Sequence, residues 1–295
     1  LYGDGPRPVG AIARFAQCRV AWLVDYVLRP RPLEAERDRL VLGNVVHAAL
    51  CELYRELAQT AAARGERQVR PRPDAMRPSR EAVRRAVLRA LHAELAPARD
   101  PLPAPPVGRL AALATEAELM VVRALELDAK RCWADRFQPL PELLEVAFGE
   151  DGSFRLGDVP LRGRIDRIDV DSSTGEAVVV DYKTGKSTDS LAHRKWLDEG
   201  ELQTAIYMLA AERTLKVGGL PLKVVGGVYV PVGGGAAQAR GVLLADAIGD
   251  GVHTNTRRAL APDSSEGDDA GALEELKRAV EGRVCELGKA LVEPD

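Results

Sequence analysis

The sequence predicts an α/β fold in which a helical N-terminal part precedes a mixed central sheet with an antiparallel meander flanked by helices. Three observations lead to this prediction. Apolar residues recur at helical spacing over the first 136 residues, and the composition changes to strand type after Pro139. The order that follows is three main strands, a helix and two strands, which does not match a doubly wound nucleotide-binding sheet.

Four helices are predicted in the N-terminal part. The periodicity of Val41, Val45 and Leu53 is typical of a helix, and Ser79 is a suitable N-cap for another. Prolines interrupt the pattern in two connectors, residues 68–80 and 97–106, because proline cannot continue a helix. The predicted helices are 9–28, 39–62, 80 to about 95, and 108–136.

Strand signals dominate the next part of the chain. Residues 171–175 (Asp-Ser-Ser-Thr-Gly) have the composition of a hairpin turn between two β-rich runs. The predicted strands are 142–149, 154–157, 160–171, 176–183, 223–231 and 239–244, with helices at 199–215 and 272–291.

These elements divide the chain into four parts. Residues 1–141 form a helical subdomain and residues 142–260 the α/β core. Residues 261–272 are acidic and rich in small side chains, so we expect a disordered linker, and residues 273–295 carry a C-terminal helix.

Charge and composition limit the class of protein. The net charge is −3, but residues 1–100 carry 18 Arg against 12 Asp and Glu, which would suit phosphate binding or simply reflect exposed helix faces. No apolar run approaches the roughly 18 residues of a membrane span. The first residues also lack the basic-then-apolar pattern of a secretory leader, so we expect a cytoplasmic protein without membrane contacts. The first residue is Leu1 rather than Met, which favours a fragment of a longer polypeptide.

Asp166, Asp181 and Lys183 form the most informative set of polar residues. Alternate side chains of a strand point the same way, so Asp181 and Lys183 share a face at the end of a buried valine run. The hairpin can bring Asp166 beside them. Two carboxylates and the backbone carbonyl of Tyr182 suit Mg²⁺, for which Mn²⁺ can substitute. Alone, such residues are more often solvent-facing strand positions.

The motifs around these residues resemble a known family. Gly163-Arg-Ile-Asp-Arg-Ile-Asp169 followed by Val179-Val-Asp-Tyr-Lys-Thr-Gly185 is similar to the RecB-like nucleases of the PD-(D/E)XK superfamily, as in the C-terminal nuclease domains of RecB and AddB. Gln203 and Tyr207 match its Q-x-x-x-Y motif, and Gly43-Asn-Val-Val-His47 matches its G-x-x-x-H motif. The resemblance covers residues 9–60 and 142–245 and implies a restriction-endonuclease-like core.

The resemblance also implies roles for individual residues. His47, Asp166, Asp181 and the Tyr182 carbonyl would bind the metal, and Lys183 would assist the attacking water. Gln203 and Tyr207 would position the DNA strand. For further DNA contacts we expect Arg164, Arg167 and Trp196, the last because it follows Arg194 and Lys195.

Some relatives also hold an iron–sulfur cluster, using one cysteine before the core and three after it. Cys18 stands where the first cysteine would be, but the trailing three are missing, so we expect no cluster in this chain. Cys51 and Cys132 fit buried, unpaired positions.

Three functions remain open. The first is the nuclease domain of a helicase–nuclease acting in double-strand-break repair and recombination, with a helicase domain or subunit as partner. The second is a stand-alone nuclease of CRISPR adaptation or phage defence. The third is a non-catalytic module that binds DNA ends. Cleavage polarity, the choice between exonuclease and endonuclease, and oligomeric state do not follow from the sequence.

Overall fold

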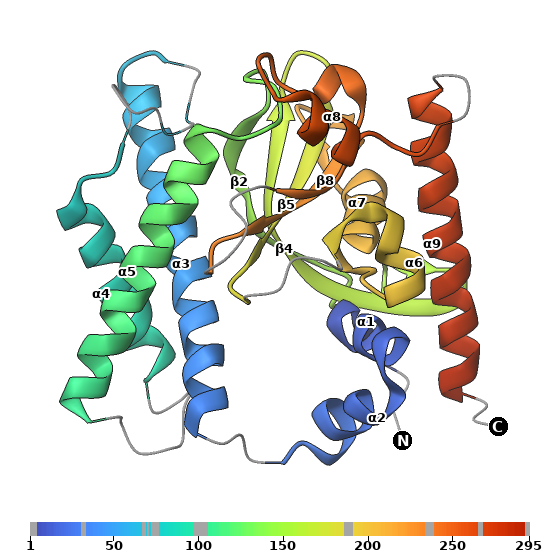
Figure 1. Ribbon diagram of the computed structural model, residues 1–295, viewed down its shortest axis with the longest axis horizontal. Coiled ribbons are helices and arrows are strands. Elements are labelled where there is room, and N and C mark those ends of the chain that lie inside the picture. Colours follow the sequence, from blue (N-terminus) through green and yellow to red (C-terminus); the bar gives the residue numbers. More distant parts are fainter. Residues whose placement is uncertain are drawn as a thin grey trace.

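The computed structural model describes residues 5–30, 34–66, 69, 71, 77–96, 106–185, 191–233, 239–264 and 268–292. A seven-stranded mixed sheet runs through its centre, which confirms the predicted α/β class. In Figure 1 the sheet lies between a layer of three helices, α3, α4 and α5, and a second group that includes α7 and α9. The first layer comprises α3 (Glu34–Ala63), α4 (Arg80–Glu94) and α5 (Val107–Ala129).

The main path of the sheet has the order β1-β4-β5-β8-β9, and β2 and β3 also pair with β4. The meander β2–β4–β5 is antiparallel, as predicted, whereas β5 and β8 are parallel and joined through helices. The strands are β1 (Arg7–Pro8), β2 (Gln138–Phe148), β3 (Arg155–Leu156), β4 (Val159–Asp171), β5 (Glu176–Lys183), β8 (Lys223–Pro231) and β9 (Arg240–Leu243), with a separate hairpin of β6 (Lys216–Val217) and β7 (Leu220–Pro221).

The remaining helices cover the other side of the sheet and its ends. Helix α7 packs on β5 and β8, and α1 and α9 pack against α7. Their bounds are α1 (Val9–Gln17), α2 (Arg19–Trp22), α6 (Trp196–Glu199), α7 (Gln203–Thr214), α8 (Thr254–Leu260) and α9 (Asp269–Val292), and a π-helical segment covers Leu23–Leu28. Among the described residues, no helix has both the length and the apolar character needed to span a membrane.

Three predicted helices differ from the structure in ways that have a local cause. The helix expected at 9–28 breaks at Cys18, which has an extended backbone. The helix expected at 199–215 breaks at Gly200, which has a φ of 73°; a Cβ at this position would lie only 2.8 Å from Ala16 Cβ, so only glycine fits. The helix expected at 108–136 ends at Ala129, because Arg131 and Trp133 turn inward to bind Asp169.

The segment 261–272 was expected to be disordered, and for its described residues this is wrong. Asp263 pairs with Arg194 at 2.6 Å, and Ser264 donates a hydrogen bond to Asp269 in the first turn of α9. Residues 265–267 lie outside the described part. The two proline-rich connectors, 68–80 and 97–106, also lie largely outside it. Ser79 caps α4 as predicted, accepting a hydrogen bond from the Ala82 amide.

The buried valines of β5 form the centre of the core. Val178, Val179 and Val180 have no exposed surface, and buried residues of both helical layers join the sheet in one continuous apolar cluster. Because this run is held rigidly from both faces, the polar residues that end β5 have fixed positions.

Candidate active site

Two carboxylates meet where β4 and β5 end their pairing. Arg167 pairs with Val180, so the next residues outward, Asp166 and Asp181, lie across from each other on the opposite face. The Tyr182 amide donates a hydrogen bond of 2.8 Å to Asp166 Oδ2. The hairpin therefore brings the Asp166 side chain to the backbone between Asp181 and Lys183.

His47 reaches the same place from α3. Its Nδ1 lies 3.1 Å from Asp166 Oδ1, and its ring meets the Tyr182 ring edge-on at 6.0 Å. Gly43, one turn earlier on α3, also lies beside the end of β5: a Cβ at this position would stand 3.5 Å from the Thr184 hydroxyl, an ordinary van der Waals contact. The G-x-x-x-H motif therefore lies next to the D-x-K strand.

Glu145 is a site residue that the sequence analysis missed. Leu144 pairs with Arg167 and Val146 with Ile165, which places Glu145 directly across from Asp166. Glu145 Oε1 lies 3.8 Å from His47 Nδ1. The ligand atoms of His47, Glu145 and Asp166 all lie within 4.8 Å of one another, close enough to hold a metal ion.

A second set of contacts ties Asp181 to Lys183 and α7. Lys183 Nζ lies 2.7 Å from Asp181 Oδ2 and donates a 3.0 Å hydrogen bond to Gln203 Oε1. Gln203 Nε2 in turn donates to Asp181 Oδ1 at 3.0 Å and to the Tyr207 hydroxyl at 3.1 Å. The Lys183 ammonium also lies 4.9 Å from the centre of the Tyr229 ring. These contacts bring together the D-x-K and Q-x-x-x-Y motifs.

The electrostatics of the two sets differ. Burial raises the pKa of Asp181 to about 6, and nearby Asp166 adds to this effect while Lys183 opposes it. Burial opposes the charged form of His47, but Asp166 and other carboxylates outweigh it and raise its pKa to about 9. Burial likewise opposes the Lys183 ammonium, yet Asp181 keeps the pKa of this lysine above its ordinary value, so Lys183 is protonated at neutral pH.

Two residues expected to contact DNA lie in the interior instead. Arg167 is 1% exposed, because its position in β4 points to the face opposite Asp166. Trp196 has no exposed surface, and its indole Nε1 donates to the Leu191 carbonyl. Neither side chain can reach a DNA strand in this arrangement. The expectation that Arg167 and Trp196 contact DNA is therefore wrong. Arg164 remains available, with a side chain 66% exposed at 3.7 Å from Glu145.

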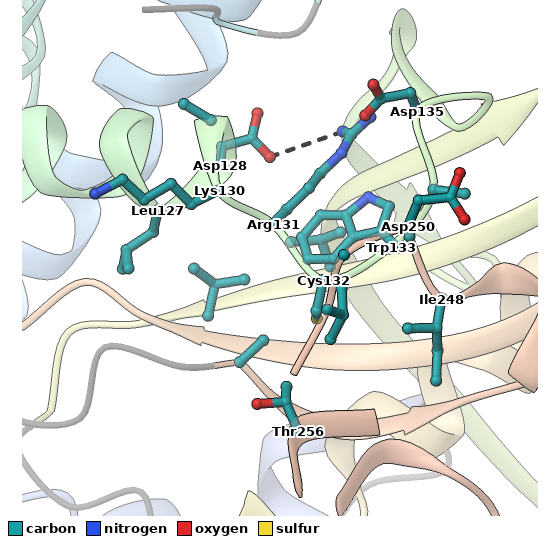
Figure 2. Close-up of a pocket in the computed structure, with 18 of the residues that line it drawn as sticks. Leu127, Asp128, Lys130, Arg131, Cys132, Trp133, Asp135, Ile248, Asp250 and Thr256 are labelled. Carbon is teal, nitrogen blue, oxygen red and sulfur yellow. Dashed lines mark ion pairs between the residues drawn. The ribbon is translucent and has the colours of Figure 1, made fainter. Parts of the chain in front are cut away.

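Arg167 belongs to a buried ionic cluster on that opposite face. It donates to Asp169 at 2.5 and 2.6 Å, to Asp128 at 3.0 Å and to the Tyr182 hydroxyl at 3.0 Å. Arg131 donates to Asp169 at 2.8 Å. Figure 2 shows Asp128 and Arg131 facing each other in a cavity of about 740 Å³, which Tyr182 and Arg167 also line. The carboxylates of the candidate active site do not line this cavity.

The donor set fits a hard or borderline divalent cation. Carboxylate oxygens and an imidazole nitrogen are ligands for Mg²⁺ and Mn²⁺, and the Tyr182 carbonyl lies on the strand between Asp181 and Lys183. Of the cysteines, Cys51 and Cys132 are buried as expected, and Cys18 is exposed.

Comparison with protein families gives a class of protein that fits this fold and this constellation of side chains. The family model of the PD-(D/E)XK nuclease superfamily matches residues 9–290, and the chain belongs to that superfamily. No curated protein matches the chain.

Proposed function

We propose that the protein is a Mg²⁺-dependent nuclease that hydrolyses DNA phosphodiester bonds, with Mn²⁺ as an effective substitute. The observation that carries this proposal is the position of Asp166 and Asp181 directly beyond the last β4–β5 pair, Arg167 with Val180, with the Lys183 ammonium 2.7 Å from Asp181. The membership of the chain in the PD-(D/E)XK nuclease superfamily supports the proposal.

Asp166, Asp181, the Tyr182 carbonyl and His47 would hold the metal. When bound, the cation offsets charge on the phosphate and lowers the pKa of water. Lys183 is protonated, so it acts as a hydrogen-bond donor and a positive charge beside the phosphate rather than as a base. The Gln203 amide orients both Lys183 and Asp181 through the hydrogen bonds described above.

Contacts to the DNA strand would come from residues around this centre. Arg164 projects into solvent beside Glu145 and can reach a backbone phosphate. Gln203 and Tyr207 share one face of α7 and would position the strand at Lys183.

For the biological setting we propose a RecB-like nuclease domain of a helicase–nuclease that processes double-strand breaks, working with a helicase domain or subunit. The intact motifs in their family order support this setting. A stand-alone nuclease of CRISPR adaptation or phage defence would share the same site. Helicase motifs elsewhere in the full-length gene would decide for the first setting, and their absence for the second.

A nuclease assay with 5′- and 3′-labelled single- and double-stranded DNA tests the activity. Wild type should cut in Mg²⁺ or Mn²⁺ and not in EDTA, and the positions of the labels give polarity. Asp181→Ala should bind the same DNA without cutting it, while Asp158→Asn, an exposed carboxylate of the β3–β4 turn, should cut normally. Undiminished Mg²⁺-dependent cutting by Asp181→Ala would rule out this mechanism. Binding of DNA ends by wild type without cleavage in either metal would point to a non-catalytic module.

A further inference from the structure

The contact between Lys183 and Asp181 conflicts with the binding of a cation by Asp181. Lys183 Nζ lies 2.7 Å from Asp181 Oδ2, and the other oxygen, Oδ1, accepts a hydrogen bond from the Gln203 amide. A divalent cation at Asp181 would compete with the ammonium for this carboxylate, and the two like charges would repel each other at short range. Lys183 therefore needs a counter-charge that is not itself a metal ligand.

The other contacts of the Lys183 ammonium lie toward the start of α7. Its Nζ donates to Gln203 Oε1 at 3.0 Å and lies 4.9 Å from the centre of the Tyr229 ring. The Tyr229 hydroxyl accepts from the Thr204 amide at 3.1 Å and donates to the Glu201 carbonyl at 3.5 Å. The ammonium is therefore held beside the segment that runs from Glu201 into α7.

Glu201 supplies a carboxylate at this place, and α1 fixes its position. The Glu201 side chain is half-buried, and Gln17 at the end of α1 donates a 2.9 Å hydrogen bond from Nε2 to Glu201 Oε1. The preceding turn packs tightly on the same helix, because a Cβ on Gly200 would lie 2.8 Å from both Ala16 Cβ and the Gln17 amide nitrogen. Among the described residues, the group that could hold a metal ion does not include Glu201.

Lys183 and Glu201 interact as opposite charges. Burial lowers the pKa of Lys183, and Asp181, Asp166 and Glu201 together raise it above its ordinary value. Burial raises the pKa of Glu201, and Lys183 is the strongest opposing influence. Asp181 and Asp166 are proposed metal ligands, so Glu201 is the member of this set that stays available to the ammonium.

We propose that Glu201 is a positioning residue, which provides the counter-charge for the Lys183 ammonium when a divalent cation binds at Asp181. Gln17 holds the Glu201 carboxylate in place. The ammonium then lies beside the phosphate and no longer competes with the cation for Asp181. The inference rests on the proposed function, because Lys183 belongs to the proposed nuclease site.

A double-mutant cycle on Mn²⁺ affinity, measured by calorimetry on the DNA-free protein, tests this inference. Glu201→Gln should bind Mn²⁺ at least about fivefold more weakly than wild type, because the ammonium then remains at Asp181. In the Lys183→Met background, which has no ammonium, the same substitution should change the affinity by less than about twofold. Glu201→Asp keeps the charge and should restore most of the affinity.

Glu199→Gln is the matched control, since Glu199 is an exposed carboxylate two residues before Glu201 and pairs with Lys195. Its Mn²⁺ affinity should equal that of wild type. Gln17→Ala should weaken Mn²⁺ binding in the same direction as Glu201→Gln but by less. At saturating Mn²⁺, Glu201→Gln should cleave about tenfold more slowly in single-turnover assays, while its DNA affinity without metal stays unchanged.

The outcomes separate this inference from the proposed function. Unchanged Mn²⁺ affinity in Glu201→Gln overturns the role of Glu201. An equal loss of affinity with and without the Lys183 ammonium also overturns it, because that loss would come only from the removal of a negative charge near the cation. Both results leave the proposed function in place if wild type cleaves DNA. A wild type that neither binds Mn²⁺ nor cleaves DNA overturns the proposed function itself.

Discussion

Strand β4 carries the tripeptide Arg-Ile-Asp twice in succession, at 164–166 and 167–169, and the two copies have opposite surroundings. In the first copy the Arg164 side chain is 66% exposed and Asp166 faces His47. In the second copy Arg167 and Asp169 are buried and bonded to each other. An offset of three residues changes the face of a strand, so the same tripeptide contributes Asp166 to the candidate active site and Asp169 to a buried ionic cluster.

The charge balance explains the difference. On the buried face, two arginines meet two aspartates, Asp128 and Asp169, and Tyr54, Tyr182 and Trp133 donate or accept the remaining hydrogen bonds. On the other face the carboxylates of Glu145, Asp166 and Asp181 meet the Lys183 ammonium and the His47 imidazole, whose pKa is raised to about 9. Removal of one partner from a balanced buried cluster is costly, because it leaves another buried charge unpaired. A row of carboxylates with an imidazole beside it instead offers ligand groups that suit a divalent cation.

Of the substitutions considered, Asp166→Asn should have the largest effect on DNA cleavage. Loss of the Asp166 carboxylate, a proposed metal ligand, should reduce cleavage by about 10³-fold or more, because the metal charge at the phosphate is lost. The free energy of unfolding should change by less than about 1 kcal/mol, since the amide still accepts from the Tyr182 N–H. Single-turnover cleavage and urea unfolding measure the two quantities. Strong destabilisation would show that Asp166 is structural.

Asp169→Asn makes the same chemical change in the second copy. It should cost about 3–5 kcal/mol of unfolding free energy, because two buried guanidinium groups lose one of their two counter-charges and only Asp128 remains. Cleavage per folded molecule should stay close to wild type at a temperature well below unfolding. If this variant is as stable as wild type, the contrast between the two copies fails.

The pH dependence of Mn²⁺ affinity tests whether the face of the sheet that carries Asp166 binds a metal through His47. His47 must lose its proton to bind a metal, and its pKa in the metal-free protein is about 9, above the ordinary 6.5. Affinity should therefore rise with pH towards 9, by up to about tenfold per unit. The sign for stability is opposite: the metal-free protein gains full stabilisation from His47 below pH 6.5 and loses it as the pH rises through 9. In His47→Asn, the contribution of His47 should disappear from the pH profile of Mn²⁺ affinity, measured by calorimetry, and from the pH profile of stability, measured by thermal melts. A wild-type Mn²⁺ affinity that does not change with pH would contradict the metal role of His47.

Tyr182→Phe should have the smallest effect. It removes the hydroxyl that accepts from Arg167, at a cost of about 1–2 kcal/mol in unfolding free energy. The backbone carbonyl and amide remain, so cleavage should fall only a few-fold. A loss beyond about tenfold, measured in the same single-turnover assay, would mean that the hydroxyl takes part in aligning the site.

Several features of fold and site followed from the sequence because they depend on local rules. Strand alternation predicted that Asp181 and Lys183 share a face, and the hairpin predicted that Asp166 lies beside them. His47 lies on a helix that is far from β4 and β5 in the sequence, and only the G-x-x-x-H motif predicted its place in the site. The same alternation places the side chains of Asp166 and Arg167 on opposite faces of β4. The expected DNA contact of Arg167 did not take this alternation into account.

Other features depend on tertiary contacts. Glu145 reaches the site through a register shift and a positive φ, which its neighbours in the sequence do not reveal. Trp196 follows two basic residues, Arg194 and Lys195, but the crossover between β5 and β8 buries it against Tyr229 and His193. The predicted continuous helix at 108–136 ends early because Arg131 serves the buried cluster, which contains residues from β4 and β5.

Tyr182 joins the two faces of the sheet, through its backbone amide on one side and its hydroxyl on the other. A designer who moved this hairpin into another scaffold would have to bring the end of α5 with it. Without Asp128 to hold Arg167 and Arg131 to hold Asp169, the transplanted strand would lose its support behind the edge that carries Asp166.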